Sequence, residues 1–391
     1  MTPDELFLNC ISAYLRGGTA EAELSGEDWL LLIRLAQEQK MLPMVFEAAG
    51  GSMPETLRTD CGKLVRRLVA AQTVRTAGFL SVYTELTAAG ITPLVVKGIV
   101  CRALYPKPDL RASADEDLYI PPAEYPAFHE KMLELGFEAG EPDYKNSHEE
   151  RYIRGGLLIE GHWELFPRDS SALNALNGYN DSFFSRAKTR RIEGAELLTL
   201  DDTDHMIFLL LHAYKHFINS GMGLRQICDI ALWAKAYALD WQRIKDAMSS
   251  ISGEYFAAAI FDAAEKLCGM SLPAGWPEAD CTALIADALC GGVYGSSDMS
   301  RRHSGTMTLS AVEAARESKT HIPLMRTLFP NRAVMEVSFP WVRKSAALLP
   351  CAWTLRILRY LGRQGEGDSA AESIRIGARR TELLREYKII E

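Results

Sequence analysis

The chain has 391 residues, which is enough for two or three domains with a sizeable core. Hydrophobic residues make up 48% and charged residues 24%, as in an ordinary soluble globular protein. The formal net charge of −8 argues against broad, non-specific nucleic-acid binding, but a nucleotide ligand stays open because metal ions can compensate its charge.

The sequence shows no signal peptide and no apolar run long enough to span a bilayer. Its eight cysteines are scattered without C-x-x-C spacing. Buried, reduced thiols fit this pattern better than disulfides or a zinc site. We therefore expect a cytoplasmic protein.

The first part of the chain, residues 1–90, is predicted to be helical. Thr2, Pro3 and Glu5 together form the start signal of a helix. A long helical pattern then runs from Pro54 and stops at Gly90.

Strands and helices mix in the next hundred residues. The β-type runs are ITPLVV (91–96), DEDLYI (115–120), the pair RYIRG (151–155) and LLIEGHWELF (157–166), and RRIEGAELLTL (190–200). From Asp201 onward apolar residues recur at helical spacing, with a flexible linker expected at RQGEGDSA (363–370). We predict an α+β fold with a small mixed sheet over 91–200, an N-terminal helical region over 1–90 and a C-terminal helical domain over 201–391.

Three consecutive acids, Asp115, Glu116 and Asp117, run directly into the β-type residues that follow. Alternate side chains of a strand face opposite ways, so Asp115 and Asp117 share one face and Glu116 lies on the other. Two carboxylates placed in this way can bind one hard divalent cation such as Mg²⁺. The alternative is an acid pair at an edge or turn without a metal.

The strand LLIEGHWELF divides in the same manner. Its apolar residues fall on one face, while Glu160, His162 and Glu164 share the other. If this strand lies beside DEDLYI, Glu160 is the best candidate for a third carboxylate at the same metal ions. Three carboxylates that hold two ions can align a triphosphate for in-line attack.

Several short motifs occur in an order that resembles the bacterial family of uncharacterised nucleotidyltransferases. They are Lys97-Gly98, Tyr105-Pro106, Arg111, Asp115 with Asp117, Glu160-Gly161-His162-Trp163, His212 with His216, and Asp229-Ile230-Ala231. The resemblance runs from about residue 90 to residue 240, and the ordered set is more specific than any single motif.

The resemblance implies a minimal nucleotidyltransferase core that moves a nucleoside monophosphate from an NTP to an acceptor hydroxyl. Asp115, Asp117 and Glu160 would be the catalytic, metal-binding acids, with two Mg²⁺ ions and the NTP as co-substrate. The acceptor would be a small molecule or a macromolecule. The residues expected to contact the nucleotide or cofactor are Lys97, Gly98, Arg111, His162, His212, Lys215, His216 and Asp229.

Two departures from the family pattern matter. Lys97-Gly98 stands where the wider superfamily has Gly-Ser; Gly98 would allow close backbone approach at a helix start, and Lys97 would meet a phosphate or simply end a strand at the surface. Glu116 replaces an apolar residue, so it needs a partner such as Arg102, Arg111 or Arg151, or an exposed edge strand. A catalytically inactive binding protein on the same fold is therefore the first alternative.

A second alternative is a metal-dependent hydrolase whose site is built from the run His148-Glu149-Glu150 together with Glu160 and His162. The histidines His212 and His216 have the spacing of a zinc protease helix, but Ala213 replaces the glutamate base, which excludes that class. We expect them to line the cleft together with Lys215, or to form a partly buried helix face.

Two further features have simple structural interpretations. Arg225 and Asp229 are spaced as a surface ion pair on a helix, although either could touch a nucleotide. The apolar, basic segment 339–363 could lie on a membrane surface, but packing against the core is the preferred interpretation because Pro350 interrupts it.

Overall fold

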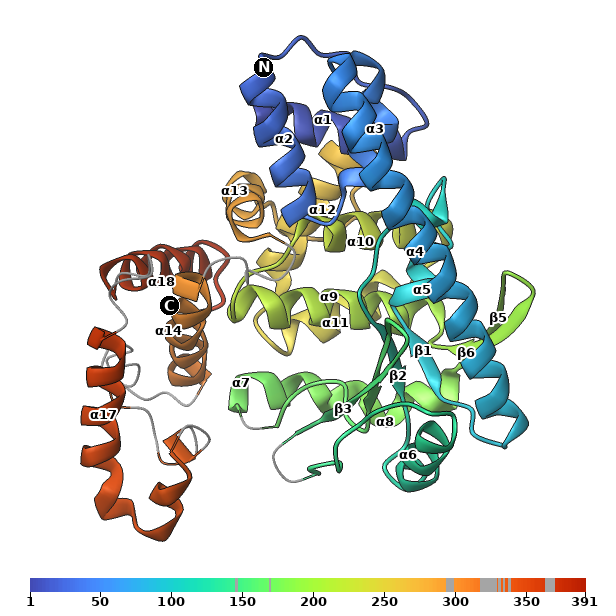
Figure 1. Ribbon diagram of the computed structural model, residues 1–391. Coiled ribbons are helices and arrows are strands. Elements are labelled where there is room, and N and C mark those ends of the chain that lie inside the picture. The colour runs from blue at the N-terminus through green and yellow to red at the C-terminus, as the bar shows by residue number, and fades with distance from the viewer. Residues whose placement is uncertain are drawn as a thin grey trace.

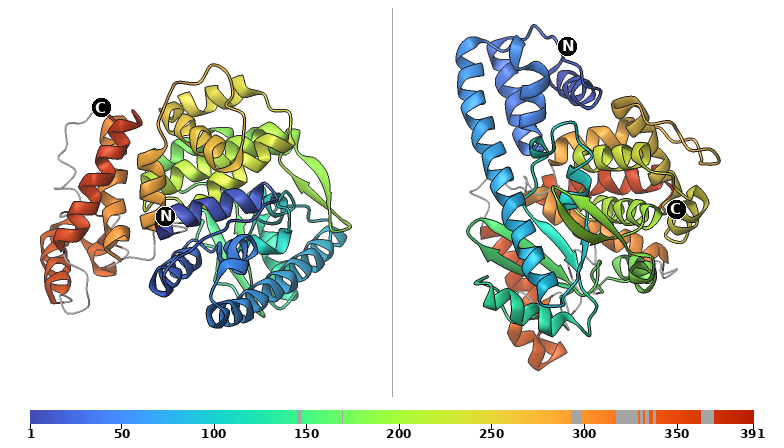
Figure 2. Two further views of the ribbon diagram at one scale, coloured as in Figure 1. Left: turned by 90° about the horizontal axis from the view of Figure 1, so that it is seen from above. Right: turned by 90° about the vertical axis from the view of Figure 1, so that its right-hand side faces the viewer.

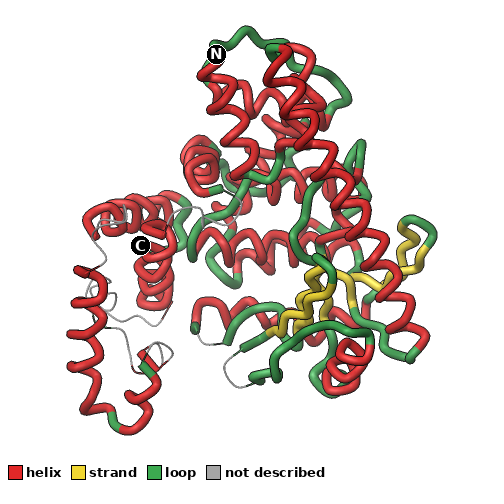
Figure 3. The backbone as a smooth tube through the Cα atoms, viewed as in Figure 1, coloured by secondary structure: helices red, strands yellow, loops and turns green. Residues whose placement is uncertain are grey.

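The computed structural model covers residues 1–391 and describes all of them except 145–146, 169, 293–298, 317–328, 330–331, 333–334, 337–338 and 363–369. Most of the expected linker at 363–370 therefore lies outside the described residues. Helices predominate, and the strands of the described residues gather in one part of the molecule (Figure 3). This arrangement confirms the α+β class.

Four helices form the N-terminal part of the chain (Figure 1). They are α1 (Pro3–Leu15), α2 (Gly26–Glu38), α3 (Leu42–Ala49) and α4 (Glu55–Ala88). The predicted start signal is present, because Thr2 and Glu5 each accept the other's backbone N–H through their side chains. The long helix α4 runs beside the sheet and contacts β4 and β6.

One mixed sheet of six strands occupies the middle of the chain, in the order β3-β4-β2-β1-β6-β5. Its strands are β1 (Leu94–Val96), β2 (Glu116–Tyr119), β3 (Glu149–Arg154), β4 (Leu157–His162), β5 (Lys188–Ile192) and β6 (Ala195–Thr199). β2 runs antiparallel to β1 and parallel to β4, whereas β1 runs parallel to β6. Both central strands are thus interior, and all their residues are buried.

The outer strands test two sequence predictions. The β-type run 190–200 lies in the hairpin of β5 and β6, which turns at Glu193-Gly194. Both turn residues have positive φ, of 48° and 86°, which suits a two-residue turn between antiparallel strands. The second prediction is corrected, because β4 ends at His162, four residues before the end of the predicted strand.

Short helices connect the strands, and a large helical part follows them. The connecting elements are α5 (Gly98–Arg102), α6 (Tyr125–Glu134), α7 (Ser171–Asn174) and α8 (Asn180–Phe183), with 3-10 turns η1 (Gly50–Ser52) in the N-terminal part, η2 (Pro108–Leu110), η3 (Ala175–Tyr179) and η4 (Phe184–Arg186). The C-terminal elements are α9 (Asp202–Ile218), α10 (Leu224–Ala236), α11 (Trp241–Ser249), α12 (Glu254–Cys268), α13 (Thr282–Gly291), α14 (Met299–Arg316), η5 (Pro340–Lys344), η6 (Ala346–Leu348), α17 (Leu349–Gly362) and α18 (Ala370–Glu386).

Helices that precede the sheet or connect its strands contact the C-terminal helices. α1 contacts α12, and α10 contacts α5 at the end of β1. Among the C-terminal helices, α14 pairs with α18, and α17 lies toward the outside of the molecule in every view (Figures 1 and 2). The described strands all fall within 91–200, but the three-part division of the chain stays a prediction.

Part of the apolar segment at 339–363 is buried in a cluster of its own. Its residues Phe339, Val342 and Ala352 pack with Met335 in a small cluster separate from the main one. For these described side chains the predicted packing partner, the main core, is therefore wrong. No helix of the described residues is both long and apolar enough to cross a membrane. All eight cysteines are free thiols.

Candidate functional site

A strained turn joins β1 to α5 and carries Lys97. Lys97 has a φ of 45° and a ψ of −120°, and Gly98 follows with a φ of 36°. Residues with a side chain rarely adopt the first of these conformations, so the surroundings must hold it. His205 on α9 accepts the Lys97 N–H at Nε2 over 3.1 Å, and Glu116 accepts the N–H of Ile99 over 2.8 Å. Such strain is typical of functional sites.

The inward-facing Glu116 is a structural support of this turn. Its Oε1 lies 2.6 Å from Arg102 Nη2, and both side chains are buried. The exposed edge strand is therefore the wrong explanation for this acid, and of the three arginines considered, Arg102 is its partner. A Cβ on Gly98 would lie 2.1 Å from Glu116 Oε2, so only glycine fits there. Glu116 takes the amide of Ile99, the second residue of α5, and the phosphate role of Gly98 stays a prediction.

The next acid along the strand faces the other side of the sheet and meets β4. Asp117 is the register partner of Glu160 in the parallel pair of β2 and β4. One ligand atom from each of Asp117, Glu160 and His162 lies within 4.8 Å of the others. All three residues are buried. The predicted neighbourhood of DEDLYI and LLIEGHWELF is thus present, and it brings these two carboxylates together.

Asp115 lies just before β2 and is half-buried. It lines the same two cavities as Asp117, but it does not belong to the close group that Asp117 forms with Glu160 and His162. The predicted metal pair of Asp115 and Asp117 therefore stays a prediction. Glu164, which was predicted to share a face with Glu160, lies beyond the end of β4 and pairs with Arg168.

Basic side chains face the acids across a cavity of about 210 Å³. Lys97 Nζ lies 3.0 Å from Asp117 Oδ1 and 2.9 Å from His212 Nε2, and its side chain is only 16% exposed. Lys97 is therefore not a surface residue at a strand end. Lys215 and His216, from the same helix α9 as His212, line this cavity as well. α9 thus presents a basic wall of Lys215 and two histidines, His212 and His216, to the carboxylates on the sheet.

Burial and neighbouring charges shift the pKa values of the acids and bases in this cavity. Burial, together with Asp117 and other nearby acids, raises the pKa of Glu160 to about 7. Burial acts the same way on Asp117, but Lys97 and His162 outweigh it and hold the pKa below its ordinary value. Burial lowers the pKa of Lys215, and burial followed by nearby cations keeps the pKa of His212 well below its ordinary value. The site therefore combines one ionised acid with one that titrates near neutrality.

A second, smaller cavity adjoins the first at Asp117. Arg111 and Asp229, both predicted to contact a nucleotide, line it but bind each other, with 2.7 Å between Arg111 Nε and Asp229 Oδ1. Tyr105 Oη donates to the same carboxylate oxygen over 2.7 Å. The predicted surface pair of Arg225 and Asp229 is wrong, because both are buried and Arg225 donates to the backbone.

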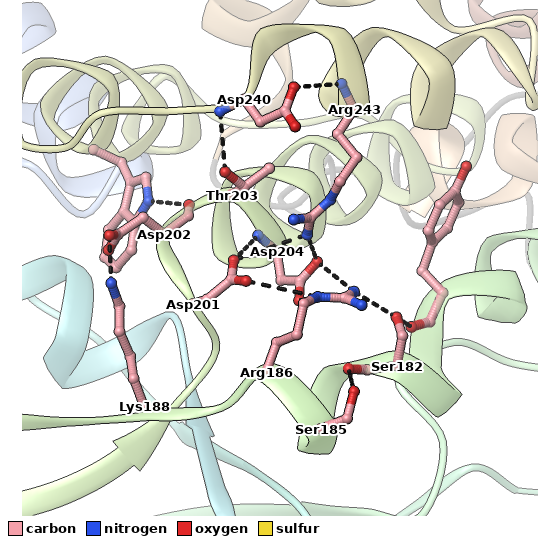
Figure 4. Close-up of polar contacts among 12 residues, drawn as sticks. Ser182, Ser185, Arg186, Lys188, Asp201, Asp202, Thr203, Asp204, Asp240 and Arg243 are labelled. Atoms are coloured by element: carbon pink, nitrogen blue, oxygen red, sulfur yellow. Dashed lines mark hydrogen bonds and ion pairs between the residues drawn. The ribbon is translucent and has the colours of Figure 1, made fainter.

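A network of ion pairs fixes the start of α9, as Figure 4 shows. Asp201 caps the helix by accepting the N–H of Asp204 over 2.6 Å. Asp204 is itself buried and is bound by Arg186 and by Arg243, which come from η4 and α11. Because α9 carries the basic wall of the cavity, this network sets where that wall lies.

Sequence reasoning missed His205, the residue that holds the Lys97 turn. Its signal was present, since His205 precedes His212 by seven residues and His212 precedes His216 by four, so the three share one side of the helix. The ring of His205 is fully buried against Trp233, with the ring centroids 4.0 Å apart. Burial, with Arg190, lowers the pKa of His205 to about 3, so the ring is neutral and can accept a hydrogen bond.

The chain matches a known protein family. The model of a family described as "Uncharacterised nucleotidyltransferase" matches residues 25–269. The matched part begins at the cap of α2, contains the whole sheet with α9 and α10, and ends at the cap of α12. No curated protein matches the chain.

Proposed function

The chain belongs to the uncharacterised nucleotidyltransferase family, and from this premise we propose that it moves a nucleoside monophosphate from an NTP to an acceptor hydroxyl. The observation that carries the proposal is the pairing of Asp117 with Glu160 on neighbouring strands, opposite the basic wall of α9. Acids that face bases across one cavity suit a substrate with a polyphosphate and a metal ion.

The donor set fits a hard divalent cation. Burial raises the pKa of Glu160 most, and repulsion from the Asp117 carboxylate raises it further. A cation between the two carboxylates would offset both effects because it stabilises the ionised form of Glu160. We assign Mg²⁺ to Asp117 and Glu160, with Asp115 as the third acid at the rim of the cavity and two ions as the expected number. When bound, the ions would neutralise charge on the transferred phosphoryl group and on the leaving pyrophosphate.

The basic residues would bind and orient the phosphates. Lys97 is held rigidly between Asp117 and His212, so its ammonium group has a fixed direction. Lys215 and His216 extend the basic wall along α9. Residues that already sit in place lose little conformational freedom when the triphosphate arrives, which is how positioning contributes to rate.

In the transfer step the acceptor oxygen bonds to the α-phosphorus, and the bond from that phosphorus to the pyrophosphate oxygen breaks. The acceptor hydroxyl must also lose its proton. A carboxylate that lines the cavity can take it, and Glu160 is our candidate.

The acceptor itself is a small molecule or a macromolecule with a free hydroxyl. The formal net charge of −8 gives no support for broad nucleic-acid binding. The structure also weakens the main reason for suspecting a catalytically inactive protein, because Glu116 has a buried structural partner in Arg102 and need not be a sign of decay.

The test is calorimetric titration of the full chain with each of the four NTPs, with and without Mg²⁺, followed by incubation with α-labelled NTP and candidate acceptors. We expect Mg²⁺-dependent binding in the wild type and its loss in Asp117→Asn and Glu160→Gln. Glu150→Gln is the matched control, because Glu150 bonds to Gly140 N–H on the far side of the hairpin. NTP binding that persists unchanged in both site variants would refute the assigned site, and absence of label transfer with any acceptor would leave a binding protein.

A further inference from the structure

A second group of metal-ligand side chains lies beside the carboxylate pair, formed by His148, Glu149 and His162. One ligand atom from each lies within 4.8 Å of the others. Glu149 Oε2 is 3.2 Å from His148 Nε2 and 3.3 Å from His162 Nδ1. In a tetrahedral site with metal–ligand bonds of about 2.0–2.1 Å, neighbouring ligand atoms lie about 3.3 Å apart. The two measured distances match the edges of such a tetrahedron.

The two ring nitrogens that face Glu149 are otherwise unsatisfied. His148 Nε2 and His162 Nδ1 are both buried, and neither forms a hydrogen bond. His162 is only 5% exposed, so bulk water has little access to the hydrogen-bonding position at its Nδ1. Buried polar atoms nearly always have a partner, and those without one point to a missing ion or water.

The other nitrogen of His162 has the partner that a metal at Nδ1 requires. A ring that binds a metal through Nδ1 keeps its proton on Nε2, and His162 Nε2 lies 3.2 Å from Asp117 Oδ1. A ligating histidine commonly donates its second N–H to a carboxylate, which fixes the tautomer and the ring orientation. Asp117 can therefore orient His162 while it binds an ion of its own.

From this geometry we propose that His148, Glu149 and His162 bind one cation of the zinc class, separate from the Mg²⁺ assigned to Asp117 and Glu160. Two imidazoles and one carboxylate favour Zn²⁺ over Mg²⁺, which prefers oxygen ligands. Three protein ligands leave a fourth position for water or substrate. Since Glu149 and His162 line the larger cavity, that position opens toward the proposed substrate site.

The test measures metal binding alone, without nucleotide, so its result does not depend on the proposed transfer reaction. The full chain is freed of metal with a chelator and titrated with Zn²⁺ in competition with a chromogenic chelator. The variants are His148→Gln, Glu149→Gln and Glu160→Gln, with His129→Gln as control because His129 lies on α6 and bonds to Tyr152. Thermal unfolding of each metal-free variant shows whether it is folded.

We expect one Zn²⁺ per chain in the wild type and in the His129 and Glu160 variants, and binding weaker by at least about 100-fold in the two ligand variants. Co²⁺ bound to the wild type should give the strong visible absorption of a four-coordinate ion. The proposal is overturned if the wild type takes up no Zn²⁺, if Co²⁺ has the weak spectrum of a six-coordinate ion, or if Glu160→Gln abolishes binding while His148→Gln does not.

Discussion

The hydrogen bond between His205 and the Lys97 turn predicts an acid-sensitive fold. The folded protein holds His205 neutral with a pKa of about 3, whereas the ring has its ordinary pKa of 6.5 in the unfolded chain. As the pH falls below the pKa of the unfolded chain, the unfolded chain binds a proton at His205 that the folded protein does not bind. This proton binding stabilises the unfolded chain relative to the folded protein. At about 1.4 kcal/mol per pKa unit, the cost is nearly zero at about pH 7.5, about 2 kcal/mol at about pH 5, and approaches 5 kcal/mol near pH 3.

The perturbation that isolates this cost is His205→Gln, because glutamine cannot titrate and its amide oxygen can still accept the Lys97 N–H. Urea unfolding of the wild type and the variant, each at several pH values, gives their difference in unfolding free energy. This difference should shift by about 2 kcal/mol in favour of the variant between about pH 7.5 and about pH 5. His129→Gln controls for the loss of one imidazole from the chain. A His205 difference that stays constant with pH would refute the reasoning, whatever its absolute size.

Three further substitutions test other parts of the site. Glu116→Gln should lower the free energy of unfolding, measured with urea, by about 3–5 kcal/mol because it leaves Arg102 buried without its charged partner. Replacing both residues by apolar side chains should lower it less than the single change does. In metal-free protein, Glu160→Gln should be stabilising by up to about 3 kcal/mol above about pH 8 and neutral near pH 4, since the raised pKa of this acid is a penalty that grows with pH; equal effects at both pH values would contradict it. Asp204→Asn should lower stability by about 2 kcal/mol and weaken NTP binding, and unchanged binding would show that the anchoring network does not set the position of α9.

The features that sequence reasoning predicts well here depend on short-range patterns. Strand alternation alone separates Glu116 from Asp117, and the structure places these two side chains in different surroundings. The helix start at Thr2 and the position of Asp201 at the beginning of the C-terminal helices follow from local capping rules in the same way. Periodicity also places His212 and His216 on one side of a helix.

Contacts between distant parts of the chain were harder to predict. Arg111 and Asp229 were both assigned to the nucleotide, but they are 118 positions apart and bind each other, which no local pattern reveals. His205 was missed because a buried histidine within an apolar helix looks like an ordinary core residue.

The three acids of DEDLYI connect the turn to the site. β2 is an interior strand, so Glu116 and Asp117 reach two different environments although they are adjacent in the chain. Glu116 binds the amide of Ile99 and thereby helps to hold the strained turn, while Asp117 binds the ammonium group of Lys97, which that turn carries. One strand therefore holds both the turn that carries Lys97 and the side chain of that lysine. Because both contacts act on this turn, we expect a change at Glu116 to alter the site even though its side chain does not line the cavity.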